Sequence, residues 1–295
     1  MKACLFYGRL SFELSNARPD LNQTGVLRKK RFKMNQINKY PRTQHIQGSR
    51  LQAGDEDLAS VPFSSVAGRF LVVEEKIDGA NCGISFYDNE LLLQSRGHYL
   101  TGGYRERHFN LLKTWATVFS HGLYNILGHR YIMYGEWMYA KHTVFYDCLP
   151  HYFMEFDIYD TQRKVFLSTG ERRKMLHGAD FIKPVPVLYS GMLNTIDELK
   201  SFLTKSLYKT ENWRNNLRNL CSKDNLDYEL VLGQTDNSDM AEGLYIKFEE
   251  DGIVRGRYKF VRSEFLARIL ASDSHWLDRP IITNLLPEGV TIWTS

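Results

Sequence analysis

The sequence is poor in cysteine, with only four among 295 residues, and these show none of the paired spacings that hold zinc or a disulfide framework. No apolar run approaches the roughly 20 residues that a membrane-spanning helix needs, so no membrane association is expected. Internal repeats and low-complexity segments are also absent. These absences exclude zinc modules, disulfide scaffolds and repeat arrays, and they favour a reducing, cytoplasmic location.

What the sequence contains is enough apolar residues for a core and a slight excess of positive charge. Hydrophobic residues make up 43% of the chain and charged residues 24%, which excludes wholesale disorder. The 38 basic and 34 acidic residues leave a net charge of +4. This charge permits a polyanionic partner without requiring one.

The first 33 residues differ from the rest, because they show no persistent period and carry a basic cluster at 28–33. Three interpretations compete: a basic arm for nucleic acid, a targeting peptide, and an upstream extension of a domain that begins at Met34. Glu13 and Asp20 disfavour a targeting peptide, since such peptides avoid acidic residues. We favour the extension, so residues 1–33 are expected to lie outside the functional domain.

From residue 70 onward, short apolar or alternating runs predict strands, and turn signals such as Asp78-Gly79 and Asp88-Asn89 separate them. Helical spacing predicts helices over the ranges between some of these strands. The order of elements favours an α+β fold with mainly antiparallel strands. The expected strands are 70–74, 83–87, 90–94, 131–137, 152–159, 185–189, 243–248 and 253–260, and the expected helices are 105–119, 171–177, two within 196–221, and 263–271.

The most informative segment is E-K-I-D-G-A-N at 75–81, which follows an apolar strand. A lysine at a half-buried strand end can lose its proton more easily, and a neutral lysine is a nucleophile. The Asp78-Gly79 turn allows the backbone to approach a ligand closely. The alternative is a plain hairpin with Lys76 in solvent, so the segment needs support from elsewhere in the chain.

That support comes from charged and aromatic residues at the ends of other predicted strands. Arg96 can bind phosphate or ribose oxygens, and His98, Arg105, Arg107 and His108 follow it closely. Glu136 and Glu242 are carboxylates at strand ends, where burial requires a partner, a ligand or a metal. A phenylalanine of the 153–158 run can stack on a base, although core packing is the commoner fate of such a ring.

Three cations follow near the last strand pair: Lys247, Arg257 and Lys259. Arg257 and Lys259 are two residues apart, so they share one face of a strand, and an anion between them would relieve their repulsion. A nucleophilic lysine, several cations, two carboxylates and an aromatic ring together suit nucleotidyl transfer from a triphosphate to lysine.

The order of these motifs resembles that of the ATP-dependent RNA ligases, a family within the superfamily that includes DNA ligases and mRNA capping enzymes. The resemblance runs from about Lys39 to Arg262 and rests on K-I-D-G-A-N, S-R-G, Y-G-E-W, F-D-I, E-G-L-Y-I-K and R-Y-K-F in this order. The K-Y-P-R-T stretch at 39–43 also looks like the start of bacterial-type RNA ligase domains. It supports Met34 as the functional beginning.

The resemblance implies a role for each motif residue. Lys76 would become adenylylated, Asp78 and Asn81 would orient it and the ribose-phosphate, and Glu75 would belong to the same nucleotide site. Families of this type usually show two lysines in the last motif, and here arginine occupies the first place. The further implied contacts are Arg96 with ribose or the incoming 5′-phosphate, Glu136 with a ribose hydroxyl, Phe156 with adenine (Phe153 as fallback), Glu242 with metal, and Lys247, Arg257 and chiefly Lys259 with phosphates.

The implied reaction joins RNA ends in three steps with ATP and Mg²⁺ or Mn²⁺ as cofactors. Lys76 takes AMP, passes it to a 5′-phosphate, and a 3′-hydroxyl then displaces it. Lys76 must be neutral to attack, and the neighbouring cations Lys247 and Lys259 are expected to lower its pKa. The implied partners are 5′-phosphate and 3′-hydroxyl RNA ends, in a nicked duplex or a hairpin, together with an end-processing kinase or phosphatase, in RNA repair.

The resemblance also implies a nucleotidyltransferase, ATP-grasp-like domain of two mainly antiparallel sheets over 34–262, with helices outside. After Lys259 too few residues remain for the OB module of DNA ligases and capping enzymes, which favours an RNA ligase. Residues 191–239 read as a helical insertion and 263–295 as a short helix and tail. The alternatives are a DNA ligase, another lysine-dependent nucleotidyltransferase, or a catalytically silent module that binds RNA ends.

Overall fold

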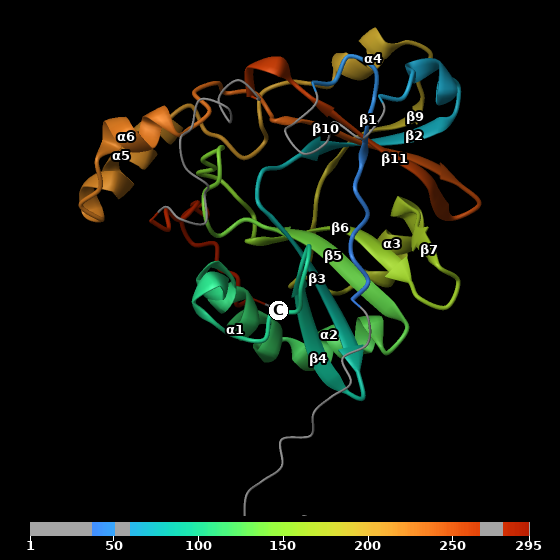
Figure 1. Ribbon diagram of the computed structural model, residues 1–295, viewed down its shortest axis with the longest axis horizontal. Helices are drawn as coiled ribbons and strands as arrows, with labels where there is room; N and C mark the ends of the chain where they lie inside the picture. The colour runs from blue at the N-terminus through green and yellow to red at the C-terminus, as the bar shows by residue number, and fades with distance from the viewer. Residues whose placement is uncertain (1–36, 51–59, 266–279, 295) are drawn as a thin grey trace, which may run out of the picture. The chain divides into compact units, whose positions relative to one another are not determined.

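The computed structural model describes residues 37–50, 60–265 and 280–294, and one mainly antiparallel sheet runs through them (Figure 1). The main path of the sheet follows the order β4-β3-β5-β6-β7-β11-β10-β2-β9 once the strands are numbered along the chain, and β1 and β8 add to it in parallel at β11 and β6. The strands are β1 (Gln44–His45), β2 (Phe70–Lys76), β3 (Ala80–Tyr87), β4 (Glu90–Ser95), β5 (Tyr131–Trp137), β6 (Phe153–Asp160), β7 (Val165–Leu167), β8 (Lys183–Pro184), β9 (Val187–Met192), β10 (Gly243–Glu250) and β11 (Ile253–Val261).

The helices are short and lie outside the sheet (Figure 1). None of those within the described ranges is long and apolar enough to cross a membrane. Three of them fall within the stretch 191–239. The helices are α1 (Asn110–Val118), α2 (Ser120–Leu127), α3 (Thr169–Met175), α4 (Ile196–Lys200), α5 (Trp213–Lys223) and α6 (Tyr228–Gly233), with 3-10 turns η1 (Phe63–Ser65) and η2 (Tyr104–Phe109).

The expected α+β class with a mainly antiparallel sheet is confirmed, but the two separate sheets are not found. The short strand β7 pairs with β6 on one side and with β11 on the other, so the two halves form one hydrogen-bonded path. Each of these pairings has only two register pairs, so β7 is a narrow connection. All named strands of the described residues belong to this sheet, so those residues contain no separate barrel.

Each half of the sheet packs on its own core. In the half with β3, β5 and β6, Cys82, Met133 and Phe153 are buried against α1 and α2. In the half with β2 and β10, Leu71 and Leu244 belong to a second cluster. This cluster also contains residues of η1, of α4 and of the segment that follows β1. The single hydrogen-bonded sheet is therefore covered by two separate hydrophobic cores, one on each half.

Local chemistry accounts for the hairpins that the sequence predicted. Asp88 and Asn89 join β3 to β4 with positive φ angles of 47° and 63°, which these two residue types tolerate better than most. The turn between β10 and β11 contains Asp251 and Gly252, again with positive φ. Both turns therefore fix the strand register where the sequence pattern placed the hairpins.

The helix expected over 105–119 is instead divided into η2 and α1. The division has a visible cause, because the carbonyl of His108 accepts a hydrogen bond from the indole of Trp137 at 2.8 Å. Leu112, Trp115 and Ala116 are buried as their helical spacing predicted. The extension 1–33 and most of the helix expected over 263–271 lie outside the described residues.

Residues 280–294 are packed against the core, which the expectation of a tail did not anticipate. Asn284 is fully buried and accepts a hydrogen bond from the backbone of Tyr146 at 2.9 Å. Its amide also donates to the carbonyl of Met138 at 2.7 Å. Ile282 and Ile292 are buried beside it, so this segment stabilises the loop that follows β5.

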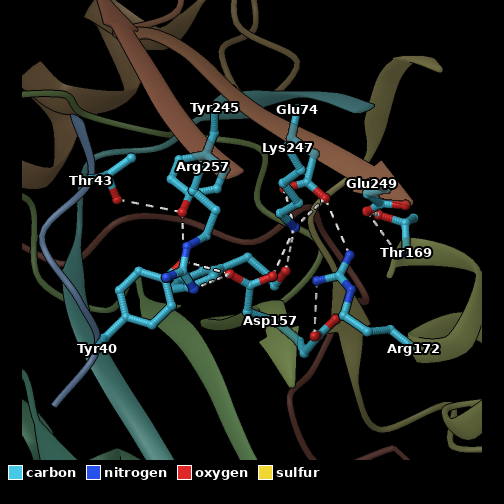
Figure 2. A network of polar contacts seen from close by, with 12 residues as sticks. Tyr40, Thr43, Glu74, Asp157, Thr169, Arg172, Tyr245, Lys247, Glu249 and Arg257 are labelled. Carbon is cyan, nitrogen blue, oxygen red and sulfur yellow. Dashed lines mark hydrogen bonds and ion pairs between the residues drawn. The ribbon is translucent and has the colours of Figure 1, made fainter. Parts of the chain in front are cut away.

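A buried ion network crosses between the two halves of the sheet (Figure 2). At its centre the ammonium of Lys247, on β10, has no exposed surface. It lies 2.9 Å from Glu74 on the neighbouring strand β2 and 3.2 Å from Asp157 on β6, in the other half. It also donates to the carbonyl of Phe156 at 2.5 Å. The network therefore connects two halves of the sheet whose strands are paired with each other only through the short strand β7.

Helix α3 adds a second cation to the network. The guanidinium of Arg172 lies 3.2 Å from Glu74 and 3.0 Å from Glu155 on β6 (Figure 2). Arg257, on β11, approaches Asp157 to 3.9 Å. Three carboxylates thus face three cations, which is the arrangement that makes buried charges tolerable.

The network predicts that Lys247→Met will be strongly destabilising, because Glu74 and Asp157 would remain buried without their shared cation. We expect the free energy of unfolding in urea to fall by about 3–5 kcal/mol. The matched control is Lys174→Met, since that lysine is largely exposed and pairs only with Glu171. The control should change stability by about 0.5 kcal/mol or less, and equal losses in the two variants would contradict this account.

Candidate active site

A cavity opens between the two halves of the sheet, and seven of the predicted site residues line it. Both halves and the connecting loops contribute to its wall. Six further lining residues had no predicted site role: Tyr40, Thr43, Glu74, Ile77, Val185 and Tyr245. The predicted residues that line it are Glu75, Lys76, Asn81, Arg96, Glu136, Phe156 and Lys259.

Lys76 is the last residue of β2 and ends in a close ion pair. Its ammonium lies 2.7 Å from one oxygen of Glu242 and 2.8 Å from the other. Burial alone would lower the pKa of Lys76, but the carboxylates of Glu242, Glu136 and Asp78 outweigh it and raise the pKa above its ordinary value. The expectation of a lowered pKa is therefore wrong, because the groups that act on Lys76 are carboxylates rather than cations.

The two carboxylates beside Lys76 are themselves perturbed. Burial raises the pKa of Glu136 to about 8, against the opposing effect of the Lys76 ammonium. Burial also raises the pKa of Glu242 to about 7, again opposed by Lys76. Ionisation of these two carboxyl groups therefore costs more free energy in the site than in water. Perturbed carboxyl groups of this kind are common in functional sites.

The turn after Lys76 is held by specific hydrogen bonds. The carboxylate of Asp78 accepts from the backbone of Thr143 at 2.7 Å and of Val144 at 2.8 Å, and its own N–H donates to the hydroxyl of Tyr146 at 2.9 Å. A side chain at Gly79 would collide with Met138 and with the backbone. Asp78 does not line the cavity, and its hydrogen bonds hold the turn that follows Lys76.

Glu75 reaches the stretch between α4 and α5. Its carboxylate accepts from the hydroxyl of Ser206 at 2.5 Å and from the backbone of Leu207 at 2.9 Å. Burial raises its pKa to about 6. Glu75 therefore fastens the stretch between α4 and α5 to the strand that carries Lys76.

The structure distinguishes the two candidate phenylalanines on β6. Phe153 is fully buried and stacks on Trp115, with ring centroids 5.3 Å apart. Phe156 is only partly buried and lines the cavity. Of the two rings, Phe156 is thus the one available to a ligand.

Lys247 and Arg257 do not line the cavity. The ammonium of Lys247 is paired with carboxylates of the buried network instead (Figure 2). The guanidinium of Arg257 lies 3.8 Å from the ring centroid of Phe166 and 5.2 Å from that of Tyr40. Although Arg257 and Lys259 are two residues apart on β11, only Lys259 reaches the cavity.

The segment before β1 supplies cavity residues without a predicted site role. The hydroxyl of Tyr40 donates to Asp157 at 2.5 Å and lies 2.5 Å from the hydroxyl of Tyr245 (Figure 2). Burial raises the pKa of Tyr40 well above its ordinary value, so this hydroxyl stays protonated. Tyr40 stood within the K-Y-P-R-T stretch of the resemblance, but no single-sequence signal placed it opposite Asp157.

A family model described as RNA ligase matches residues 69–261, which is more than half of the chain. This chain belongs to the RNA ligase family. The membership implied by the order of the motifs is thereby confirmed. A search of curated proteins gives no match.

Two solved structures of a Naegleria gruberi RNA ligase illustrate how distant the similar structures are. One, a lysine-to-alanine mutant with ATP and Mn, has 16% identity and a TM-score of 0.47, over 79% of this chain and 58% of that chain. The other, with pyrophosphate, has 17% identity and a TM-score of 0.48, over 80% and 59%. This RNA ligase family member therefore spans less than two thirds of the length of those chains.

The described residues of this RNA ligase family member contain no group of three His, Cys, Asp or Glu side chains that could hold a metal by themselves. This donor set suits Mg²⁺ or Mn²⁺ only if substrate phosphates and water complete the coordination, as is usual for Mg²⁺. Glu136 lines the cavity, and Glu242 does not line it but lies against the Lys76 ammonium. Both would supply carboxylate oxygens to such a shared site, so the residues present fit the expected cation.

The perturbed carboxylate of Glu136 predicts a pH-dependent cost to stability. Its pKa of about 8 lies above the unfolded value, so the native state binds the proton more tightly, and stability falls as the pH rises from about 4.5 to 8. Glu136→Gln should therefore raise the melting temperature at pH 8 by about 2–6 °C. The gain should nearly vanish at pH 5, and a gain of equal size at both pH values would contradict the assignment.

Proposed function

We propose that this chain is an ATP-dependent RNA ligase that joins 3′-hydroxyl and 5′-phosphate RNA ends through a lysyl-AMP intermediate on Lys76. One observation carries the proposal: the Lys76 ammonium ends in a cavity whose walls hold both a partly buried aromatic ring and two cations. The ring suits a nucleobase and the cations suit phosphates. Lys76 is then placed to attack the phosphorus between them.

The nucleotide is proposed to lie across the cavity from one half of the sheet to the other. Phe156 would stack on adenine, and Glu136 would accept a hydrogen bond from a ribose hydroxyl. Arg96, the exposed residue that follows β4, would bind the phosphate of the incoming RNA end, and Lys259 would bind the α-phosphate. Lys259 is favoured over Arg257 for the α-phosphate because it is the one of the two that lines the cavity.

In the first step the Nζ lone pair of Lys76 attacks the α-phosphorus of ATP, a P–N bond forms, and the bond to pyrophosphate breaks. Lys76 must first lose a proton to water, because in its charged form the ammonium is paired with the carboxylate of Glu242 at 2.7 Å. A divalent cation bound at Glu242 would neutralise negative charge on this carboxylate and on the phosphates. Once Glu242 no longer stabilises the ammonium, the burial of Lys76 favours its neutral form.

The remaining steps use the same cations for a different phosphate. The AMP passes from Lys76 to the 5′-phosphate of an RNA end, which forms a phosphoanhydride and regenerates the lysine. A 3′-hydroxyl then attacks that phosphate, a phosphodiester forms, and AMP leaves. Arg96 and Lys259 would neutralise the charge that develops in each transfer.

The residues behind the cavity are proposed to position those that face it. Asp78 and Asn81 would fix the turn and the ribose-phosphate, and Glu75 would hold the stretch between α4 and α5 against the lysine strand. Lys247 and Arg257 would act through Asp157 by keeping the two halves of the cavity at a constant separation. The reaction needs 5′-phosphate and 3′-hydroxyl ends, so we place it in RNA repair after an end-processing kinase or phosphatase.

The first test follows the label of α-labelled ATP into protein that has been stripped of bound AMP. We expect a labelled band in the presence of Mg²⁺ or Mn²⁺, reversed by pyrophosphate and reduced at least 1,000-fold in Lys76→Ala, because no other side chain replaces the nucleophile. Lys174→Ala, an exposed lysine, is the control and should label normally. A wild-type protein that takes no label would sink the ligase proposal in favour of a silent binding module.

The second test compares nicked duplexes made of RNA strands with nicked duplexes made of DNA strands, under conditions in which the enzyme is already adenylylated. We expect sealing of RNA at least 100-fold faster than sealing of DNA, since the proposed substrate is RNA with a 2′-hydroxyl at its ends. Gel analysis of the joined product gives the rates. Faster sealing of the DNA nick would reassign the chain to the DNA ligase alternative.

A further inference from the structure

One aromatic side chain of this chain is exposed to an extent that folding does not explain. Tyr104, the first residue of η2, is 79% exposed, more than any other large hydrophobic side chain in the described part of the chain. A ring in this state gains almost none of the free energy that burial provides. The face of this ring is therefore accessible to a ligand.

The exposed ring is held in place by a cation. The guanidinium of Arg107, one turn along η2, lies 5.0 Å from the ring centroid of Tyr104. Arg107 also donates a hydrogen bond to the hydroxyl of Tyr104 at 2.7 Å. The pair presents a flat aromatic surface next to a positive charge, and nucleobases and phosphates bind such surfaces.

The loop beneath this pair is fixed rather than loose. Glu106, almost fully buried, accepts hydrogen bonds from the backbone of Thr101 at 3.2 Å and of Gly102 at 2.8 Å. The ammonium of Lys113 on α1 lies 2.5 Å from the same carboxylate. A buried carboxylate that satisfies two backbone donors and one cation keeps the loop in one conformation, so the exposed ring is presented without a large entropic cost.

The segment that carries this pair begins at the rim of the cavity. At its start, Arg96 lines the cavity, and the chain turns back at once because the N–H of Ser95 donates to the carbonyl of His98 at 2.9 Å. At its end, the carbonyl of His108 accepts a hydrogen bond from the indole of Trp137, which is buried in the core on the face of β5 opposite to the cavity residue Glu136. The Tyr104–Arg107 pair therefore lies on a segment that starts beside the reaction site and is fastened to the core at its other end.

We infer that Tyr104 and Arg107 form a stacking platform for a nucleobase of the RNA strand that carries the 5′-phosphate. This inference rests on the proposed function, in which Arg96 binds that phosphate. The strand would leave the cavity past Arg96, and the next exposed aromatic ring along the chain after Arg96 is that of Tyr104. Stacking uses the face of a base and not its edge, so the platform accepts all four bases and the ligase would tolerate any sequence at the joined end.

The test is abasic scanning of the 5′-phosphate strand combined with Tyr104→Ala. With intact RNA we expect Tyr104→Ala to lower kcat/KM for sealing about tenfold, the order expected for losing one stacked base. At one of the first four positions an abasic site should slow the wild-type enzyme to the same extent and have no further effect on the variant. Tyr104→Phe should seal normally, because it retains the ring.

The matched control is Tyr87→Ala, which removes an exposed tyrosine at the far end of the β3–β4 hairpin from Arg96. It should seal RNA at the wild-type rate, and all the variants should form lysyl-AMP normally because that step involves no RNA. Two results would overturn the platform. One is equal kcat/KM for sealing by Tyr104→Ala and the wild type, and the other is a loss in Tyr104→Ala that is as large with every abasic strand as with intact RNA. Absence of lysyl-AMP in the wild type would instead overturn the proposed ligase, and fluorescence anisotropy with the same intact and abasic oligonucleotides would still decide on the platform.

Discussion

The attraction between Lys247 and Asp157 is the constraint on which the arrangement of this fold depends. Among the strands of the described residues, only the short strand β7 pairs with both halves of the sheet, with two register pairs on each side. The cavity draws its wall from both halves, so any change in their separation would change its width. The buried ion pair keeps the distance between the two halves nearly constant, because separating the two charges would leave each of them unpaired in the interior at a high cost in free energy.

The same physical principle has opposite results at two positions on one face of β2. Glu74 completes a balanced set of charges, whereas Glu136 and Glu242 crowd around the single ammonium of Lys76. The first group is satisfied and stabilises the fold. The second has more carboxylates than cations, so it favours the binding of positive charge. Stability and readiness for a ligand are therefore separated by two residue positions along a strand.

The sequence was a good guide to strands, hairpins and cavity residues, since alternation and turn chemistry are local properties. Strand β5 has the predicted bounds, and Lys76, Glu136 and Lys259 meet in one cavity as their motifs implied. It was a poor guide wherever a distant partner decides the outcome. Lys247 looked like a phosphate ligand because nothing in its neighbourhood along the chain reveals Asp157. Arg257 is likewise held away from the cavity by Asp157 and by aromatic rings that other segments contribute.

The burial of Asn284 has a consequence for the order in which the site is built. Its side chain clamps Tyr146, whose hydroxyl in turn holds the turn that follows Lys76, although the two residues are 138 positions apart. Chains emerge from the ribosome N-terminal end first. A growing chain that already displays the lysine and all of its motif partners would still lack this clamp. Protein synthesis itself would thus delay assembly of the lysine loop until nearly all of the described chain has been made.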